Sequence, residues 1–534
     1  AAEDESSAAE LLASAERAMS DGDYAAGVAR YVEAAAARDS VETARQATLV
    51  AFEFGFDALA VTAAQRWASL SAKPDDAGLF GALAQIRAGD TQAGGNQLAG
   101  IFDRATDADA VCGTIRESLL DGVRADHAAV VFGKLAKRFD ELPCVLRLAV
   151  SAAISVRDYE AADNYFGRLS KIDAFDNDAR LLKLTSLIQQ DQGEAAFTDP
   201  DLYLDGSATA RQQVELAFLN ARAESTDNAT ILLEQLRLEY PNDVEVLEAL
   251  ALVYLQAGNV DMARRLFLEM LSSGKKTNNA LYYLARFAER ERRFDQAIRM
   301  YSQVDYGDLT VAAQRRAATL LTQRDDAAAG LAHLQQFVTR HPRYGLEISA
   351  MQASLYADDG DYAQALELYD AYLAIKPGAE FAMLARADVM LRDGRLDDAI
   401  KAFRAALAAY PKSANTLNAL GYTLADRTRK LREAEKLIDR ALALEPDNAA
   451  IIDSKGWVLF QRGKLKEARE YLERAWSMFQ DPEVAAHLGE TLWRLGEEDK
   501  ARELLQEAWQ RFPDDDTLRD TVQRLLEDGP ATRS

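Results

Sequence analysis

A small residue recurs at a nearly constant interval along the second half of the chain. The recurring positions are Ala263, Ala297, Gly330, Ala365, Ala399, Ala434, Ala468 and Ala501, and successive members lie 33 to 35 residues apart. A unit of this length cannot bury its apolar face alone, so it is stable only when it stacks on neighbouring units. The period therefore predicts an array of repeats rather than one globular core, and the length of 534 residues agrees with this.

Each repeat has the pattern of two helices joined by a tight turn. In "DSKGWVLFQRGKLKEAREYLERA" (453–475), apolar residues recur at intervals of three and four, and Gly463 supplies the turn. The small residues Gly456 and Ala468 allow the two helix backbones to approach closely. Prolines that follow a helix and prevent its continuation occur at Pro241, Pro342, Pro377, Pro411, Pro446 and Pro513. The sequence thus predicts an all-α solenoid of stacked antiparallel helix hairpins.

These positions resemble the tetratricopeptide repeat (TPR). In the unit 346–377, the slots of the 34-residue pattern hold Ala353, Tyr356, Gly360, Asp361, Tyr362, Ala365, Tyr369, Tyr372 and Pro377. The match extends over residues 244–513, and the resemblance implies a superhelical array that binds other proteins.

The regularity of the pattern divides the chain into four parts. Residues 1–188 read as degenerate TPR-like repeats, and 210–513 as a regular array. Between them, at 189–209, glycines and prolines break the helical period, which indicates an interrupted repeat or hinge. Residues 514–534 read as a capping helix and tail, because the exposed end of an array needs a polar face. We therefore expect two functional blocks, one on each side of 189–209.

The resemblance also identifies a candidate partner-binding surface. In TPR arrays, certain slots of the first helix of each hairpin line a concave groove. Those slots hold Phe381, Asp388, Asn415, Asn418, Tyr422, Asp453, Trp457, Phe460, Glu490 and Trp493. A stripe of aromatics, amides and carboxylates suits recognition of an extended or helical peptide. The alternative is that Trp457, Phe460 and Trp493 pack against adjacent repeats. The lysines of a clamp for chaperone tails are missing, which disfavours a cochaperone.

Composition and motifs argue against several other functions. A formal net charge of −24 opposes nucleic-acid binding, which needs a basic surface. The four histidines, His127, His333, His341 and His487, fall in different hairpins, so no local metal site is expected. Nucleophile elbows, P-loops and dinucleotide-binding motifs are absent from the sequence. We therefore expect no catalysis, no cofactor and no metal.

Two cysteines, Cys112 and Cys144, lie 32 residues apart, close to one repeat length. This spacing suits neighbouring hairpins, but it does not establish that the two cysteines pair.

The run 417–476, followed by 483–509, is similar to proteobacterial TPR lipoproteins of the outer membrane. Within that group, the resemblance implies a periplasmic adaptor that binds and activates a carboxyl-terminal processing protease and delivers peptidoglycan hydrolases to it. It also implies membrane attachment through an N-terminal lipid. The chain opens with "AAEDESSAAE" rather than methionine, so we expect that the export signal and the lipidated cysteine have been removed. The alternative is a structural component of an envelope assembly, such as a polysaccharide-export or outer-membrane machine.

Overall fold

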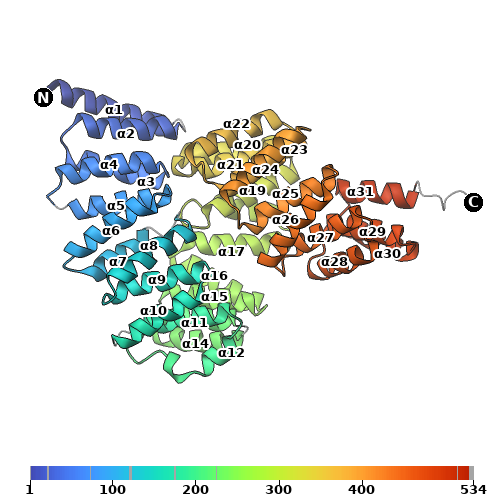
Figure 1. The fold of residues 1–534 in the computed structure, drawn as a ribbon, viewed down its shortest axis with the longest axis horizontal. Coiled ribbons are helices and arrows are strands. Elements are labelled where there is room, and N and C mark those ends of the chain that lie inside the picture. Colours follow the sequence, from blue (N-terminus) through green and yellow to red (C-terminus); the bar gives the residue numbers. More distant parts are fainter. Residues whose placement is uncertain are drawn as a thin grey trace, which may run out of the picture. The chain divides into compact units, whose positions relative to one another are not determined.

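The computed structural model describes residues 2–20, 23–72, 74–118, 123–172, 176–223, 225–513 and 515–527. Every regular element within these residues is helical, and antiparallel helix pairs follow one another along the chain (Figure 1). Two compact units divide the chain, Ala1–Ile348 and Ser349–Ser534, with the boundary inside one helix, α21. The all-α repeat architecture predicted from the sequence is confirmed.

In the described residues of the first unit there are twenty complete α-helices. These are α1 (Ala2–Ser20), α2 (Tyr24–Ala37), α3 (Val41–Glu53), α4 (Asp57–Leu70), α5 (Pro74–Arg87), α6 (Thr91–Arg104), α7 (Ala108–Ser118), α8 (Ala125–Arg138), α9 (Pro143–Ser155), α10 (Tyr159–Lys171), α11 (Asn177–Gln189), α12 (Gly193–Thr198), α13 (Ala210–Arg222), α14 (Thr226–Glu239), α15 (Val244–Gln256), α16 (Val260–Ser273), α17 (Thr277–Arg290), α18 (Phe294–Ser302), α19 (Thr310–Arg324) and α20 (Ala327–Arg340). Two short 3-10 turns, η1 (Pro200–Leu202) and η2 (Pro342–Tyr344), interrupt them.

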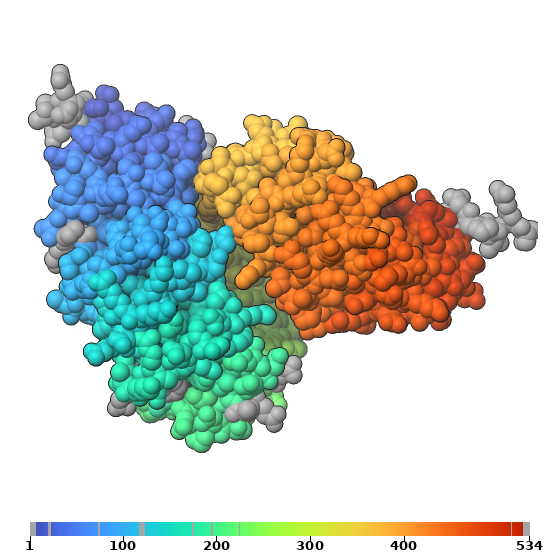
Figure 2. All heavy atoms as spheres, in the orientation of Figure 1, coloured from blue at the N-terminus to red at the C-terminus, as the bar shows by residue number. Residues whose placement is uncertain are grey.

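The second unit begins within α21 (Gly345–Asp358) and ends in a helix that closes the array. It contains α22 (Tyr362–Ile375), α23 (Glu380–Arg392), α24 (Leu396–Ala409), α25 (Ala414–Arg427), α26 (Leu431–Leu444), α27 (Ala449–Gln461), α28 (Leu465–Met478), α29 (Pro482–Arg494), α30 (Glu498–Arg511), α31 (Asp516–Val522) and a π-helical turn, η3 (Gln523–Glu527). The colours of the sequence form contiguous bands on the surface, as expected when each repeat contacts its neighbours along the chain (Figure 2).

The recurring small residues lie where helices pack most closely. The seven alanines of the series are fully buried, and Gly330 is buried as well. On α27, a Cβ atom added at Gly456 would lie 2.5 Å from Leu472 Cγ on α28. A side chain at this position would overlap its neighbour, so glycine is required. The sequence period therefore marks the contact points between paired helices.

Several turns between paired helices share one geometry. Gly360 and Gly463 adopt φ values of 87° and 76°, in the left-handed region that favours glycine. After Gly360, the next helix starts from a polar cap: the Asp361 side chain accepts a hydrogen bond from the Gln364 backbone N–H at 3.1 Å. The sequence "GDY" thus ends one helix and begins the next.

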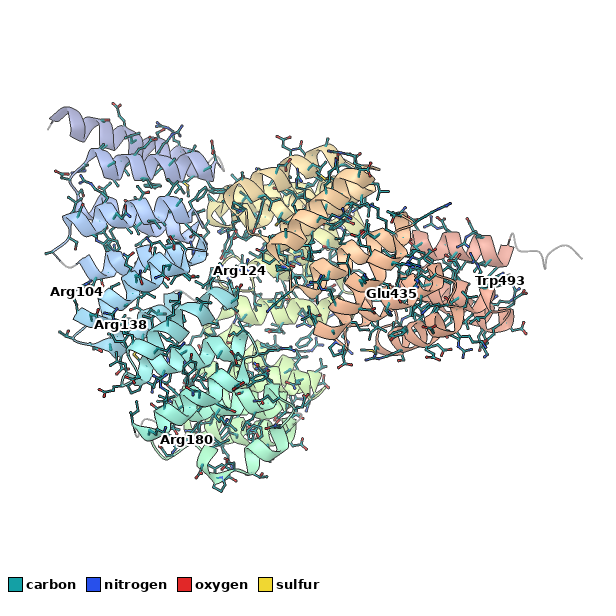
Figure 3. All side chains as sticks on the ribbon, in the orientation of Figure 1. Arg104, Arg124, Arg138, Arg180, Glu435 and Trp493 are labelled. Atoms are coloured by element: carbon teal, nitrogen blue, oxygen red, sulfur yellow. A yellow bond between two sulfur atoms is a disulfide. The ribbon has the colours of Figure 1, made fainter. Side chains whose placement is uncertain are left out.

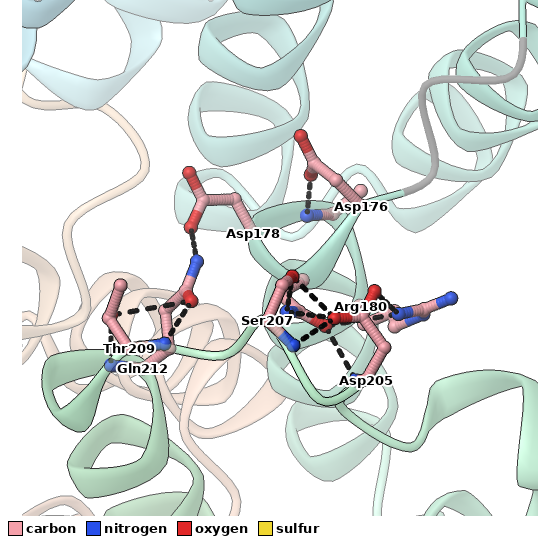
Figure 4. A network of polar contacts seen from close by, with 9 residues as sticks. Asp176, Asp178, Arg180, Asp205, Ser207, Thr209 and Gln212 are labelled. Carbon is pink, nitrogen blue, oxygen red and sulfur yellow. Dashed lines mark hydrogen bonds and ion pairs between the residues drawn. The ribbon is translucent and has the colours of Figure 1, made fainter.

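The region 189–209, predicted as an interruption, holds one six-residue helix, α12, and the turn η1. The segment that follows is fixed by a polar network (Figure 4). The Asp205 carboxylate accepts hydrogen bonds from Asn177 Nδ2 at 3.1 Å and from Arg180 Nη1 at 3.0 Å, both on α11. Hydrogen bonds from the Ser207 hydroxyl and backbone N–H, followed by those from Asn177 and Arg180, hold the pKa of Asp205 far below its usual range. The interruption is thus tied to the preceding helix, and its role as a functional boundary stays a prediction.

A disulfide joins Cys112 on α7 to Cys144 on α9, with a Cα–Cα distance of 6.0 Å. Both cysteines are buried. The sequence left this pairing open, and the structure supplies it. No helix in the described part of the chain is long and apolar enough to cross a membrane.

Candidate functional site

All ten candidate partner-binding residues lie on α23, α25, α27 and α29, the first helices of four consecutive hairpins. The last three of these helices start at a side-chain cap. Ser413 accepts from the Thr416 N–H, Asn448 from Ala450, and Asp481 from Glu483. Because each cap fixes where its helix begins, it also fixes which residues face the same side on successive repeats.

A buried polar and aromatic cluster joins α27 to α29. His487 Nδ1 lies 3.1 Å from both carboxylate oxygens of Asp453. The imidazole stacks on the Trp457 ring at a centroid distance of 4.0 Å, and Trp457 stacks on Phe460 at 4.8 Å. Asp453, Trp457, Phe460 and His487 are all buried. This cluster fixes the register of two adjacent repeats.

Contacts from α25 extend this cluster over α27. The Tyr422 hydroxyl donates a hydrogen bond to Glu483, on α29, 61 residues further along the chain. Trp457 Nε1 donates to Asp426 Oδ1 at 3.2 Å. On α26, Asp439 and Glu435 accept from Lys455 Nζ at 2.6 and 3.2 Å (Glu435 is labelled in Figure 3). The whole run 451–460 of α27 is therefore buried.

Burial and charge act in opposite directions on the titratable groups of the cluster. Burial lowers the pKa of His487, but the charge and hydrogen bond of Asp453 raise it, and the net pKa lies above the ordinary value for histidine. Burial and the neighbouring Glu483 raise the pKa of Tyr422 far above its usual value. Tyr422 thus remains a hydrogen-bond donor at neutral pH. A buried cluster of this kind holds the helices of adjacent repeats together.

The structure separates the ten candidate residues into an accessible group and an interior group. Phe381, at 54% exposure, Asp388 and Asn415 are exposed, while Asn418 and Tyr422 are partly buried. Asp453, Trp457 and Phe460 belong to the buried cluster. Trp457 and Phe460 make the contacts expected from the alternative interpretation, in which these aromatic side chains pack against adjacent repeats. Direct partner contact by the accessible group stays a prediction.

The last two candidate residues are covered by the end of the chain. Glu490 on α29 forms an ion pair with Arg524 in η3. Trp493, labelled in Figure 3, packs in the apolar cluster that includes Leu518 and Leu525. The terminal helix α31 therefore lies over this part of α29, in the way a capping helix of a solenoid does.

Two cavities open beside the buried cluster, and both are lined by Tyr422 and Glu483. The first, of about 450 Å³, is also lined by residues of α23 and α24, among them Asp388 and Leu391. The second, of about 250 Å³, lies among α25, α27 and α29 and includes Asn418. Four of the predicted residues, Asp388, Asn418, Tyr422 and Asp453, thus line an accessible hollow.

The first unit has a cavity of its own, of about 590 Å³, lined by α7, α9, α11 and α13. Its walls include both cysteines, Arg147 and Glu215. Arg147 Nη1 forms an ion pair with Asp176 Oδ2 at 2.7 Å, and burial together with Asp178 raises the pKa of Glu215. This surface is polar and charged.

The described residues include no group of three or more His, Cys, Asp or Glu side chains placed to hold a metal ion.

Sequence reasoning missed several residues of this region. Phe479 is 61% exposed and lines the second cavity, although it lies between helices rather than in a repeat slot. His487, considered above only as a metal ligand, is a partner of Asp453. His487 and Asp453 are separated by 34 residues, which is one repeat length, and this spacing is the sequence signal that could have identified the pair.

Family models for the tetratricopeptide repeat match six ranges, the last five of which overlap. These ranges are 248–308, 315–380, 351–414, 384–449, 419–477 and 459–525. Together they span most of residues 248–525, the region in which the hairpins are regular. The chain belongs to the tetratricopeptide repeat family.

Two curated proteins are similar to this TPR chain. The TPR repeat-containing protein PA4667 of Pseudomonas aeruginosa is 39% identical over 246 residues, which cover 46% of this chain and 42% of that protein. Cellulose synthase operon protein C of Pseudomonas fluorescens is 24% identical over 277 residues, 49% of this chain and 19% of that protein. The alignments thus cover less than half of the length of each relative.

Solved structures of similar chains include yeast Tom70, which is 15% identical in sequence and has a TM-score of 0.37. The alignment covers 98% of this TPR chain and 96% of the Tom70 chain. A tetratricopeptide repeat protein from Parabacteroides merdae has 15% identity, a TM-score of 0.37, and coverage of 46% of this chain and 98% of its own.

Proposed function

We propose that the chain is a non-catalytic adaptor that binds and activates a carboxyl-terminal processing protease and delivers cell-wall hydrolases to it. The general part of this proposal, that the chain is a protein-binding scaffold, rests on the family, because TPR proteins bind protein partners through their arrays. The specific part, that the chain activates a protease and delivers hydrolases to it, rests on one observation. The run 417–509, which lies in α25 to α30, resembles the Pseudomonas adaptor LbcA, and LbcA is the lipoprotein partner of the protease CtpA. The similarity to a TPR protein of Pseudomonas aeruginosa supports it.

The proposed compartment is the periplasmic face of the bacterial outer membrane, with attachment through an N-terminal lipid. The disulfide between Cys112 and Cys144 supports an oxidising compartment, because disulfides persist in the periplasm and are rare in the cytosol.

An adaptor must hold protease and substrate together, which raises their effective concentration. In our proposal the repeats before 189–209 dock the protease and the later array holds the hydrolase, or the reverse. The cavity beside Tyr422 offers a surface in the later array, whereas the cavity of the first unit is lined by helices from both sides of 189–209.

The test is a pull-down with the full chain from a periplasmic extract of a pseudomonad, read by mass spectrometry. We expect a carboxyl-terminal processing protease and at least one peptidoglycan hydrolase, both enriched over beads alone. Recovery of neither would contradict the proposal.

The second candidate is a structural subunit of an envelope assembly. The observation in its favour is the similarity to cellulose synthase operon protein C. The same experiment on detergent-solubilised membranes separates the two, since an assembly subunit would retain integral membrane proteins and polysaccharide synthases rather than a soluble protease.

A further inference from the structure

We infer that the two cavities beside Tyr422 and Glu483 receive a basic side chain, arginine or lysine, from an extended segment of a protein partner. This inference rests on the scaffold function proposed above and gives the chemistry of the partner at this surface.

The first cavity has two carboxylates that form no ion pair. Asp388 forms no hydrogen bond or ion pair in the part of the chain that the structure describes, although the charge of Arg392 acts on it. Glu483 accepts a hydrogen bond from the Tyr422 hydroxyl, and its charge acts on His487. The two cations of the cavity are already engaged: Arg392 pairs with Asp358 at 2.9 Å, and Arg427 Nε pairs with Asp426 Oδ2 at 2.7 Å. The cavity partly desolvates the Asp388 carboxylate and so raises its pKa, although the residue as a whole is exposed. A cation from outside would complete this site.

The same cavity has an apolar wall made by Leu384, Leu391 and Phe403. Arginine and lysine carry a long aliphatic stem that packs on apolar surface while the charged head reaches polar groups. The combination of an apolar wall and uncompensated carboxylates therefore fits these two side chains. An acidic side chain would instead face Asp388 and Glu483 and be repelled.

The second cavity provides an independent observation. Asn418 Oδ1 is buried and has no hydrogen-bond partner in the structure. A buried acceptor without a donor costs free energy, and the side chain that carries this acceptor lines the second cavity. Glu483 is a second acceptor in the same cavity, and the exposed ring of Phe479 adds a surface on which a guanidinium can stack. A guanidinium group or a peptide N–H supplies the hydrogen-bond donors that these acceptors can bind.

The test measures binding of fluorescein-labelled ten-residue Gly-Ser peptides to the full chain by fluorescence anisotropy at low salt. One peptide carries two arginines, and its partner carries citrulline, the neutral isostere, at the same positions. Charge-assisted hydrogen bonds predict about ten-fold tighter binding of the arginine peptide. The double variant Asp388→Asn/Glu483→Gln should lose about that factor. The control, Asp397→Asn/Glu470→Gln, removes the same charge from α24 and α28, outside both cavities, and should change binding by less than about two-fold.

Equal losses in the two double variants would overturn the inference, because they would show attraction to the net negative charge alone. Equal binding of the arginine and citrulline peptides, or no binding of either, would also overturn it. The single variant Asp388→Asn, at an exposed position, guards against misfolding and should by itself weaken binding several-fold. The assay contains no protease, so failure here is distinct from failure to activate one.

Discussion

His487 on α29 is paired with Asp453 on α27 in the interior of the second unit: the Nδ1 atom lies 3.1 Å from each carboxylate oxygen, and the two residues are 4% and 5% exposed. A buried pair tolerates little displacement, because each group loses its partner if the helices slide. The pair therefore specifies how one repeat stacks on the next.

This pair makes the stability of the second unit pH-dependent. Because the folded-state pKa of His487 is raised, its stabilisation is complete below the ordinary imidazole pKa of about 6.5 and is lost as pH rises through the higher folded-state pKa. We expect His487→Gln to lower the melting temperature of the full chain more at pH 6 than at pH 9. Removing one partner of a buried pair costs about 3–5 kcal/mol at the lower pH. If the His487→Gln variant lost the same amount of melting temperature at both pH values, the assignment of the pH dependence to His487 would be contradicted.

We predict that the Trp457 side chain stabilises the folded chain. Replacing Trp457 with alanine removes the stacking on Phe460 and His487, and should cost about 3–5 kcal/mol. Phe381→Ala, at an exposed ring, is the control and should change the melting temperature little. If both variants melt alike, the burial of Trp457 does not describe the protein in solution.

The close approach at Gly456 predicts a clash on adding a single methyl group. Gly456→Ala should destabilise by about 1–3 kcal/mol, because the new Cβ would overlap Leu472. Gly167→Ala, in α10 where a Cβ meets nothing within 4 Å, should be neutral or stabilising by about 0.5–1 kcal/mol. Chemical denaturation of both variants checks the contrast, which fails if Gly456→Ala is the more stable of the two.

The disulfide between Cys112 and Cys144 should stabilise the first unit by roughly 2–4 kcal/mol, given the loop of 32 residues that it closes. Reductant should therefore lower the melting temperature of the native chain and leave the Cys112→Ala/Cys144→Ala variant unaffected. Peptide mapping without reduction identifies the linked peptides. Free thiols at both positions in protein purified from the periplasm would contradict the pairing.

The sequence predicts the hairpins well because their determinants are local. Ala365, Gly360 and Asp361 each act within one hairpin, through close packing, a left-handed turn and a helix cap. The sequence does not show which residues of the candidate surface are accessible, because their exposure depends on contacts between repeats.

Spacing within one repeat places Trp457 in a groove slot, but it does not show that Tyr422 and Glu483 meet across α27 and enclose that helix. Nor does it show that the terminal helix covers Trp493. Such contacts depend on the rotation between successive hairpins, which accumulates along the array and is not encoded in any single repeat.

The central claim is that the chain activates a protease by holding it with its substrate. The most direct measurement is the rate at which a purified carboxyl-terminal processing protease degrades a purified peptidoglycan hydrolase, with and without the full chain. We predict that the chain alone cleaves nothing and that its addition speeds cleavage at least about ten-fold, as a raised effective concentration requires. Acceleration should also fall when excess chain places the two partners on separate copies. An unchanged rate at every concentration of the chain would contradict the claim.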